Sequence, residues 1–300
     1  MLPVDMDCCQ GLLPGTAVGN CLVSECPQLM SEWLKLIKDA WKMTGQPQGL
    51  TAAVSKAHLS QIRLVATDMD GTLTADGEFT PMLLEAFESL RHHKIEVMIV
   101  TGRSAGWVSA IVNYLPVVGA IAENGGLYID KQQPDPIILP DIPRMSQHRD
   151  RLSKVFQKLQ QRHPHLKPSL DNPYRITDWT FDVAGLEPAD IDWLRETCQA
   201  QTMGFTYSNV QCHIQVLRQN KAAGLKRVLA AKFDQLSADA VLTVGDSPND
   251  ESLFDAEQFP HSVGVANVAH YLPRLGHMPT YITSAAEVQG FVELTRYLVN

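Results

Sequence analysis

Short aliphatic runs recur along the chain from about Gln61, and amphipathic stretches separate them. The runs contain no charged residue, which is typical of parallel strands buried on both faces. Strands are predicted at Leu64-Val65-Ala66, Val97–Val100, Ala120-Ile121-Ala122 and Val241–Val244. Between the first two, Thr80 and Pro81 predict a helix start. Its buried stripe would be Met82, Leu83, Ala86, Phe87 and Leu90. Ser104 is the predicted cap of the next helix, which runs to about Leu115. This alternation predicts an α/β fold around a mainly parallel sheet.

A long stretch between Asn124 and Lys221 interrupts the alternation. It exceeds what one crossover connection needs and predicts a second, inserted domain, here called the cap. Its pattern is mixed. Strands are predicted at Pro136–Leu139, Trp179–Val183, Phe205–Ser208 and Gln211–Val216, the last two as a hairpin around Ser208-Asn209. Helices are predicted around the apolar positions Leu152, Val155, Phe156 and Leu159, and from Glu187-Pro188 to about Gln201. We expect a core of residues 61–130 and 216–300 and an α+β cap of residues 131–215.

Residues 1–60 form an N-terminal extension that we expect to be partly helical or disordered. Apolar residues recur there at helical spacing and predict one amphipathic helix over Ser31–Met43. Such a helix is a partner-binding arm, an accessory helix, or part of an over-long gene start before Met43. The cysteines Cys8, Cys9, Cys21 and Cys26 cluster there without the paired spacing of a zinc site.

Composition narrows the possible partners. The chain has 300 residues, of which 45% are hydrophobic and 19% charged, so it can bury a large core. A net charge of -8 argues against a nucleic-acid backbone as partner, since phosphate binding there needs clustered positive charge. No window approaches the roughly 20 apolar residues of a membrane span. The first basic residue is Lys35, so a secretory signal is not expected either. We therefore expect a cytoplasmic protein with no membrane partner and a small molecule as ligand.

Two acids directly follow the first predicted strand, Asp68 and Asp70. Ligands gather at the carboxyl ends of parallel strands, so this position suits chemistry. Two like charges that close are costly unless a cation lies between them or one keeps its proton. The alternative is an exposed strand end with two solvated acids.

Four separated motifs make the chain resemble the haloacid dehalogenase-like phosphatase superfamily. They are Asp68-Met69-Asp70-Gly71-Thr72-Leu73, Thr101-Gly102-Arg103, Lys221 at a helix start, and Gly245-Asp246-Ser247-Pro248-Asn249-Asp250. The resemblance covers Gln61 to the C-terminus and implies a Rossmann-like core with an inserted cap. The position of the cap and the run Glu123-Asn124-Gly125-Gly126 resemble the subfamily of Cof-type, sucrose-phosphate and mannosyl-3-phosphoglycerate phosphatases. One departure is Ala222, where many relatives have glycine after the lysine.

The resemblance implies a role for each motif residue. Asp68 would be the nucleophile that forms an aspartyl phosphate, and Asp70 the general acid and base. Thr101 would hold a phosphoryl oxygen and Lys221 would screen the nucleophile, although a solvated lysine at a helix start is the alternative. The implied cofactor is Mg²⁺, held by Asp68, the Asp70 carbonyl, Asp246 and Asp250. The expected substrate contacts are Gly102, Arg103, Asn124 and Asn249.

Within the cap, Arg175 is a candidate for contacting a polar leaving group. A structural ion pair with Asp178 is the alternative. The basic residues Arg151, Lys154, Lys158 and Arg162 lie opposite a predicted apolar face and are expected to be solvated.

The sequence thus predicts a Mg²⁺-dependent phosphomonoester hydrolase of a small phosphorylated metabolite, such as a sugar phosphate. A phosphotransferase or phosphomutase would use the same intermediate but pass the phosphoryl group to another hydroxyl. A catalytically silent regulatory protein is the non-enzymatic alternative. The substrate and the oligomeric state stay open.

Overall fold

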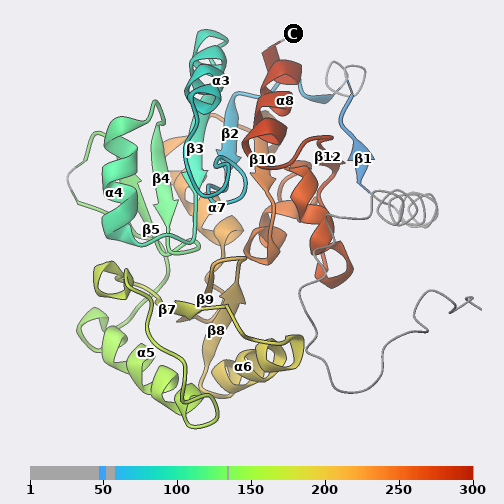
Figure 1. Ribbon diagram of the computed structural model, residues 1–300. Coiled ribbons are helices and arrows are strands. Elements are labelled where there is room, and N and C mark those ends of the chain that lie inside the picture. Colours follow the sequence, from blue (N-terminus) through green and yellow to red (C-terminus); the bar gives the residue numbers. More distant parts are fainter. Residues whose placement is uncertain (1–46, 52–57, 134, 300) are drawn as a thin grey trace, which may run out of the picture. The chain divides into compact units, whose positions relative to one another are not determined.

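The computed structural model describes residues 47–51, 58–133 and 135–299 (Figure 1). The helix predicted over Ser31–Met43 and the N-terminal cysteines lie outside these residues. Among the described residues, no helix combines the length and apolarity needed to cross a bilayer.

A nine-stranded sheet forms the core, in the order β1-β12-β11-β10-β2-β3-β4-β5-β6. Its strands are β1 (Gln48–Gly49), β2 (Leu64–Thr67), β3 (Glu96–Val100), β4 (Gly119–Ala122), β5 (Leu127–Asp130), β6 (Ile137–Ile138), β10 (Val241–Gly245), β11 (His261–Gly264) and β12 (Tyr281–Ile282). Along this order, every neighbouring pair between β1 and β4 is parallel. The β4–β5 and β5–β6 pairs are antiparallel. The predicted α/β class and the four predicted core strands are confirmed.

Helices cover both faces of this sheet because successive strand residues point to opposite sides. Val65 and Val97 face a core cluster with α3 (Pro81–His92), α4 (Ala105–Tyr114) and α8 (Glu287–Val299). Leu64 and Met98 face the other cluster, with α7 (Lys221–Lys232) and the 3₁₀ segment η4 (Pro248–Phe254). Strands buried on both faces explain the uninterrupted aliphatic runs in the sequence. Shorter 3₁₀ segments complete the core at η3 (Ala238–Ala240), η5 (Ala266–His270) and η6 (Leu272–Arg274).

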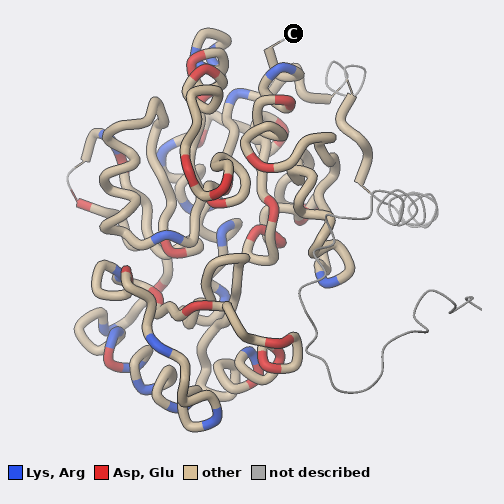
Figure 2. The backbone as a smooth tube through the Cα atoms, viewed as in Figure 1, with Lys and Arg blue, Asp and Glu red and all other residues tan. Residues whose placement is uncertain are grey.

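The cap is a three-stranded antiparallel sheet packed against two helices. Its sheet order is β7 (Trp179–Asp182), β9 (Gln211–Val216) and β8 (Met203–Tyr207). Helices α5 (Met145–Gln160) and α6 (Pro188–Ala200) bury Leu152, Phe156 and Leu194 against it. Figure 1 shows both helices along the cap sheet. The predicted hairpin around Ser208-Asn209 is confirmed by the β8–β9 pairing. The short segment η2 (Asn172–Tyr174) precedes β7. Arg151, Lys154, Lys158 and Arg162 are exposed on or just after α5, as predicted. Figure 2 shows several Lys and Arg positions along this helix.

Two short strands depart from the predicted domain division. We expected Pro136–Leu139 to form a cap strand, but β6 pairs with β5 at the edge of the core sheet. Residues Gln48 and Gly49, expected in a separate extension, pair with β12 at the other edge. Both strands have two residues, too few for hydrophobic periodicity to identify their partner.

Candidate active site

Three acids from two neighbouring strands converge at one edge of the sheet. Asp68 follows β2 and Asp246 follows β10, and these strands pair in parallel, so their carboxyl ends lie side by side. Asp250 comes from η4, which begins shortly after β10. The three side chains are buried, and one carboxylate oxygen from each lies within 4.8 Å of the others. Of the four acids expected at the metal site, Asp68, Asp246 and Asp250 therefore bring their carboxylates together, whereas the Asp70 carboxylate is not part of this group.

Lys221 is the first residue of α7, and its side chain is fully buried beside these acids. Its Nζ donates to Asp68 Oδ1 and, at 2.6 Å, to Asp250 Oδ1. The alternative of a solvated lysine is wrong. The Asn220 side chain caps the helix by accepting from Ala223 N at 2.7 Å, which fixes the turn that carries the lysine.

Electrostatics in this cluster are dominated by burial. Burial raises the pKa of Asp68 to about 7 against the opposing attraction of Lys221, and the charges of Asp250 and Asp70 add to the rise. Burial also raises the pKa of Asp246 well above its ordinary value, with Asp68 and Asp250 contributing. Three buried carboxylates thus face one ammonium group. Hard oxygen donors with an excess of negative charge fit a divalent cation.

The two outer acids of the cluster have different surroundings. Asp250 accepts from Lys221 through one oxygen and from the Asp246 and Ser247 amides through the other, at 3.0 and 3.1 Å. Asp246 accepts instead from Asn267 Nδ2 at 2.8 Å. Asp250 therefore supports the loop and the lysine, whereas Asp246 is positioned by a neighbouring side chain. Sequence analysis did not identify Asn267, although it closely follows β11 at the same sheet edge.

Asp70 lies outside the three-acid cluster and pairs with Arg103. Arg103 Nε donates to Asp70 Oδ2 at 2.9 Å, and Nη2 donates to Oδ1 at 2.5 Å. The guanidinium also lies 4.8 Å from the ring centroid of Trp107. Both oxygens of Asp70 are thus occupied, and Arg103, expected to bind substrate, contacts the expected general acid.

The Thr101–Arg103 turn follows β3 and carries the expected phosphate contacts. Thr101 Oγ1 accepts from the Arg103 amide at 3.1 Å. A Cβ at Gly102 would lie 3.1 Å from the His213 ring and 3.2 Å from Asn124 Nδ2, so glycine permits this close approach. Asn124 Oδ1 accepts from Asn249 Nδ2 at 3.0 Å, whereas its buried Nδ2 has no partner among the described residues. Asn124 is therefore an available donor beside the turn.

The β8–β9 hairpin closes the site from the cap side. A small cavity of about 20 Å³ lies between the two domains. Its lining residues are Asp68, Asp70, Thr101, Gly102, Arg103, Ser247 and Asn249 from the core, and Ser208, Asn209, Val210, Gln211 and His213 from the cap. Sequence analysis placed the hairpin but did not identify these cap residues as part of the site, because a strand pattern does not show which loop faces another domain.

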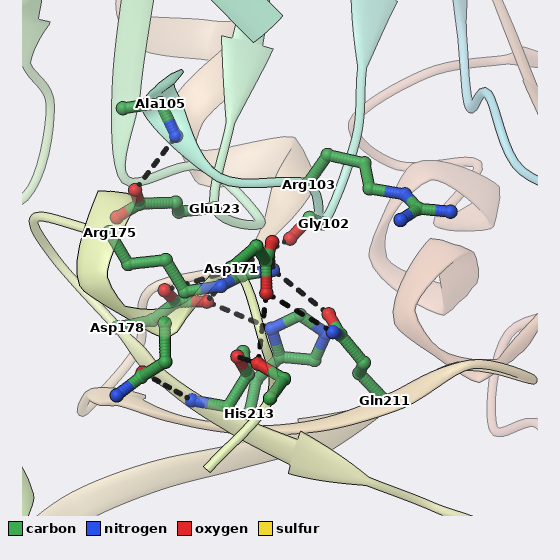
Figure 3. A network of polar contacts seen from close by, with 12 residues as sticks. Gly102, Arg103, Ala105, Glu123, Asp171, Arg175, Asp178, Gln211 and His213 are labelled. Carbon is green, nitrogen blue, oxygen red and sulfur yellow. Dashed lines mark hydrogen bonds and ion pairs between the residues drawn. The ribbon is translucent and has the colours of Figure 1, made fainter. Parts of the chain in front are cut away.

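We considered Arg175 a candidate for contacting the leaving group, but it does not line the cavity. Its side chain is buried, and Nη1 donates to Asp178 Oδ2 at 2.9 Å and to the Gly102 carbonyl at 2.8 Å (Figure 3). Its Nη2 donates to Asp171 Oδ2 at 2.8 Å and to Gln211 Oε1 at 2.9 Å. The ion pair with Asp178, given as the alternative, is present. The terminal nitrogens are therefore occupied by protein acceptors and leave no free N–H there for a leaving group.

Glu123 is a second buried anchor between core and cap. It follows β4 and accepts from the amides of Ile176 and Thr177, with Thr177 N at 2.6 Å. It also accepts from Ala105 N at 3.0 Å and from Thr177 Oγ1 at 2.7 Å. Burial raises the pKa of Glu123 to about 7, aided by Asp178 and opposed by the Thr177 hydrogen bonds and the charge of Arg175. Glu123 thus holds the cap segment next to Arg175 against the core.

Comparison with known proteins gives consistent relatives. Residues 65–163 match a family model described as haloacid dehalogenase-like hydrolase. Phosphoglycolate phosphatase 1 of Saccharolobus solfataricus is 28% identical over 242 residues, which cover 79% of this chain and 96% of that protein.

Solved structures share the fold at lower identity. The C-terminal domain of trehalose-6-phosphate phosphatase from C. albicans has a TM-score of 0.63 at 16% identity, covering 84% of this chain and 98% of that domain. The sucrose-phosphatase of Synechocystis, in complex with sucrose and phosphate, has a TM-score of 0.57 at 20% identity, covering 79% of this chain and 98% of that one. These likenesses show the fold alone.

Proposed function

We propose that the chain, which matches a haloacid dehalogenase-like hydrolase model over residues 65–163, is a Mg²⁺-dependent phosphatase of small phosphate monoesters. The observation that carries the proposal is the burial of Asp68 beside Asp246, Asp250 and Lys221. A buried acid with an adjacent ammonium is suited to attack a phosphorus atom, because the ammonium can also contact the phosphoryl oxygens.

Hydrolysis proceeds in two displacements at Asp68. A carboxylate oxygen of Asp68 attacks phosphorus, the bond to the leaving oxygen breaks, and Asp70 gives that oxygen a proton. Water then attacks the phosphoryl group, passes a proton to Asp70, and releases phosphate and free Asp68. Asp70 must leave Arg103 to do this, because both of its oxygens accept from that side chain in the closed form. Arg103 is then free to contact the substrate.

The remaining residues hold the phosphoryl group. Thr101 Oγ1, the Gly102 amide and Asn124 Nδ2 are the donors proposed for its oxygens, because hydrogen bonds aimed at developing charge lower the barrier. Asn249 orients Asn124 through the hydrogen bond to its Oδ1. Asp68 and Asp246 would hold Mg²⁺, together with the Asp70 carbonyl, and the ion supplies positive charge that offsets the phosphate dianion. Asp250 takes part indirectly, through Lys221 and the loop amides.

The leaving group is proposed to be small and polar. The cap residues beside the candidate acids are mostly polar, with Val210 among Ser208, Asn209, Gln211 and His213. A compact ester such as phosphoglycolate, the compound in the names of several relatives, suits this lining better than a disaccharide phosphate.

Release of inorganic phosphate tests the proposal. Purified protein with MgCl₂ would be assayed on p-nitrophenyl phosphate, phosphoglycolate and several sugar phosphates. We expect activity that EDTA and Asp68→Asn each reduce to background. Asp192→Asn, which changes an exposed acid on α6, is the matched control and should retain full activity.

Two outcomes would contradict this function. Activity that survives Asp68→Asn would exclude the aspartyl-phosphate route. Appearance of the phosphoryl group on an added sugar hydroxyl, without free phosphate, would instead identify a phosphotransferase.

A further inference from the structure

Arg175 connects the cap to the phosphate-binding turn at one point. Among the described residues, its acceptors Asp171, Asp178 and Gln211 all lie in the cap. The Gly102 carbonyl is the acceptor that lies in the core. The bond from Arg175 to Gly102 therefore forms only when the cap is docked.

The Gly102 carbonyl shares its peptide group with the Arg103 amide. In a trans peptide the C=O and N–H point in opposite directions, so fixing one fixes the other. Arg175 fixes the carbonyl at 2.8 Å, and the amide on the other side donates to Thr101 Oγ1 at 3.1 Å. Because Thr101 Oγ1 already accepts this amide, its own hydrogen is free to donate. None of the described residues accepts that hydrogen, and Thr101 lines the cavity beside Asp68.

We propose that Arg175 is a positioning residue through which cap docking directs the Thr101 hydroxyl at the phosphoryl group. The chain of hydrogen bonds runs from Arg175 through the Gly102–Arg103 peptide to Thr101, and each bond polarises the next. The inference rests on the proposed phosphatase function and assigns Arg175 a role in the reaction without contact to the substrate. Catalytic competence is thereby coupled to the closed position of the cap.

Two sets of contacts hold the Arg175 guanidinium in the position that this role requires. The Asp178 carboxylate that pairs with Arg175 also accepts from His213 Nδ1 at 2.8 Å. Glu123 binds the amides of the next two residues, Ile176 and Thr177. The guanidinium is therefore oriented from the cap side and from the core side at once.

A double-mutant cycle in kcat tests the relay. Arg175→Met alone would leave the buried Asp178 carboxylate charged and without its guanidinium partner, so Arg175→Met is combined with Asp178→Asn and compared with Asp178→Asn alone. With p-nitrophenyl phosphate and MgCl₂ we expect kcat to fall about tenfold and KM to change less than about threefold, since donors to developing charge act on kcat. Thr101→Val should lower kcat about a hundredfold. In the Thr101→Val background the Arg175 substitution should cause no further loss, because its effect passes through the missing hydroxyl.

A control and a binding measurement separate positioning from packing. Asp171→Asn changes a cap contact of the same guanidinium but leaves the Gly102 bond, and should keep kcat within about twofold of wild type. Orthovanadate, which resembles the five-coordinate transition state, should inhibit the Arg175 variant about tenfold less strongly, with the same dependence on Thr101.

Each result decides between the alternatives. Additive losses from the Arg175 and Thr101 substitutions in an active wild-type enzyme would overturn the relay alone. An equal loss in Asp171→Asn would also overturn it, since the effect would then be general packing. A wild-type protein that releases no phosphate from any ester would overturn the proposed function and the relay with it.

Discussion

The charge of Lys221 offsets part of the negative charge of the buried acids around it. Its ammonium contacts Asp68 and Asp250 and lies at the base of the cluster that also contains Asp246. Burial opposes the charged form of Lys221, but the two carboxylates outweigh burial and raise its pKa. Removing one member of such a buried set leaves uncompensated charge, which costs more than the pair itself contributes.

Replacing this lysine is expected to destabilise the whole core. Lys221→Met should lower the free energy of unfolding by about 3–5 kcal/mol and abolish phosphate release, because Asp68 and Asp250 lose their counter-charge. Urea denaturation followed by fluorescence measures the first effect. Lys226→Met, at an exposed position of the same helix, is the control and should change stability by less than about 0.5 kcal/mol. Equal stability of the two variants would contradict this balance of charge.

The pH dependence of stability should contain a contribution from His148. This residue is buried on α5, and its Nε2 lies 2.8 Å from the Thr177 carbonyl. Burial lowers its pKa from the ordinary value of 6.5, with Arg149 and Arg151 adding to the effect and Thr177 and Asp178 opposing it. The unfolded chain then binds the proton more readily, so this stability is complete above pH 6.5 and is lost as pH falls below it.

His148→Gln keeps a donor for the carbonyl but cannot titrate. Its free energy of unfolding should fall less steeply with decreasing pH than that of wild type, by up to about 1.4 kcal/mol per pH unit. Urea unfolding at several values between pH 5 and pH 7.5 measures the two slopes. His165→Gln, in the exposed loop after α5, should keep the wild-type slope. Identical slopes for all three proteins would argue against a neutral buried His148.

Individual residues differ in how far sequence could predict them. Asp68, Asp246 and Lys221 each follow a strand or begin a helix, so parallel topology brings them together without further information. Arg175 was a candidate for contacting the leaving group because it enters a strand in the middle of the cap, but its guanidinium is turned toward Asp178 and the Gly102 carbonyl. Asn267 carried no motif and became visible only through its contact with Asp246.

At the level of elements, the turn between β4 and β5 is packed tightly against α7. Gly125 has a φ of +92°, and a Cβ there would lie 2.1 Å from the Asn220 carbonyl. Asn220 caps α7 immediately before Lys221, so this contact joins the β4–β5 turn to the N-terminus of α7. Gly224, one turn into α7, faces the same glycine, with the Gly125 Cα 2.6 Å from where its Cβ would lie. Position 224 therefore requires glycine. The residue directly after Lys221 is instead alanine, Ala222.

A pair of glycine substitutions separates backbone strain from this close contact. Gly125→Ala and Gly77→Ala both place alanine at positive φ, +92° and +80°, but a Cβ at Gly77 meets no atom within 4 Å. Gly77→Ala should cost about 1–2 kcal/mol from conformation alone. Gly125→Ala should cost at least about 2 kcal/mol more and reduce phosphate release, because it displaces Asn220 and Lys221. Similar stability and activity for both variants would show that the contact at Gly125 relaxes freely.

Short elements also limited what the sequence could predict about the sheet. Strands β2, β3, β4 and β10 were evident because they are aliphatic and buried on both faces. Strand β6 was assigned to the cap because it lies after the point where the chain leaves the parallel core, yet it pairs with β5. Pairing of a two-residue edge strand depends on backbone hydrogen bonds, which leave no side-chain periodicity.

For the molecule as a whole, core and cap residues together enclose the cavity beside Asp68. The cavity of about 20 Å³ between core and hairpin is far smaller than a phosphate ester needs. A single ordered water already requires a volume of about 10–15 Å³. The proposed phosphatase function therefore requires the hairpin, with Asn209 beside Gly71, to move away from the core when substrate enters. Polar contacts such as Arg175 to Gly102 must break in that motion and re-form around the substrate.

Hydrogen exchange should report this opening directly. In the free protein we expect the amides of Val210 and Gln211 at the hairpin turn, and those of Ile176 and Thr177 that bind Glu123, to exchange faster than the buried amides of β2. Addition of MgCl₂ and orthovanadate should slow all four about tenfold or more, because a bound phosphate analogue favours the docked cap. Amides in the middle of α6, which lies within the cap and does not line the cavity, serve as the internal control and should keep their rates. If the four amides exchange as slowly in the free protein as in the vanadate complex, the cap is already closed at rest, and substrate must reach Asp68 by another path.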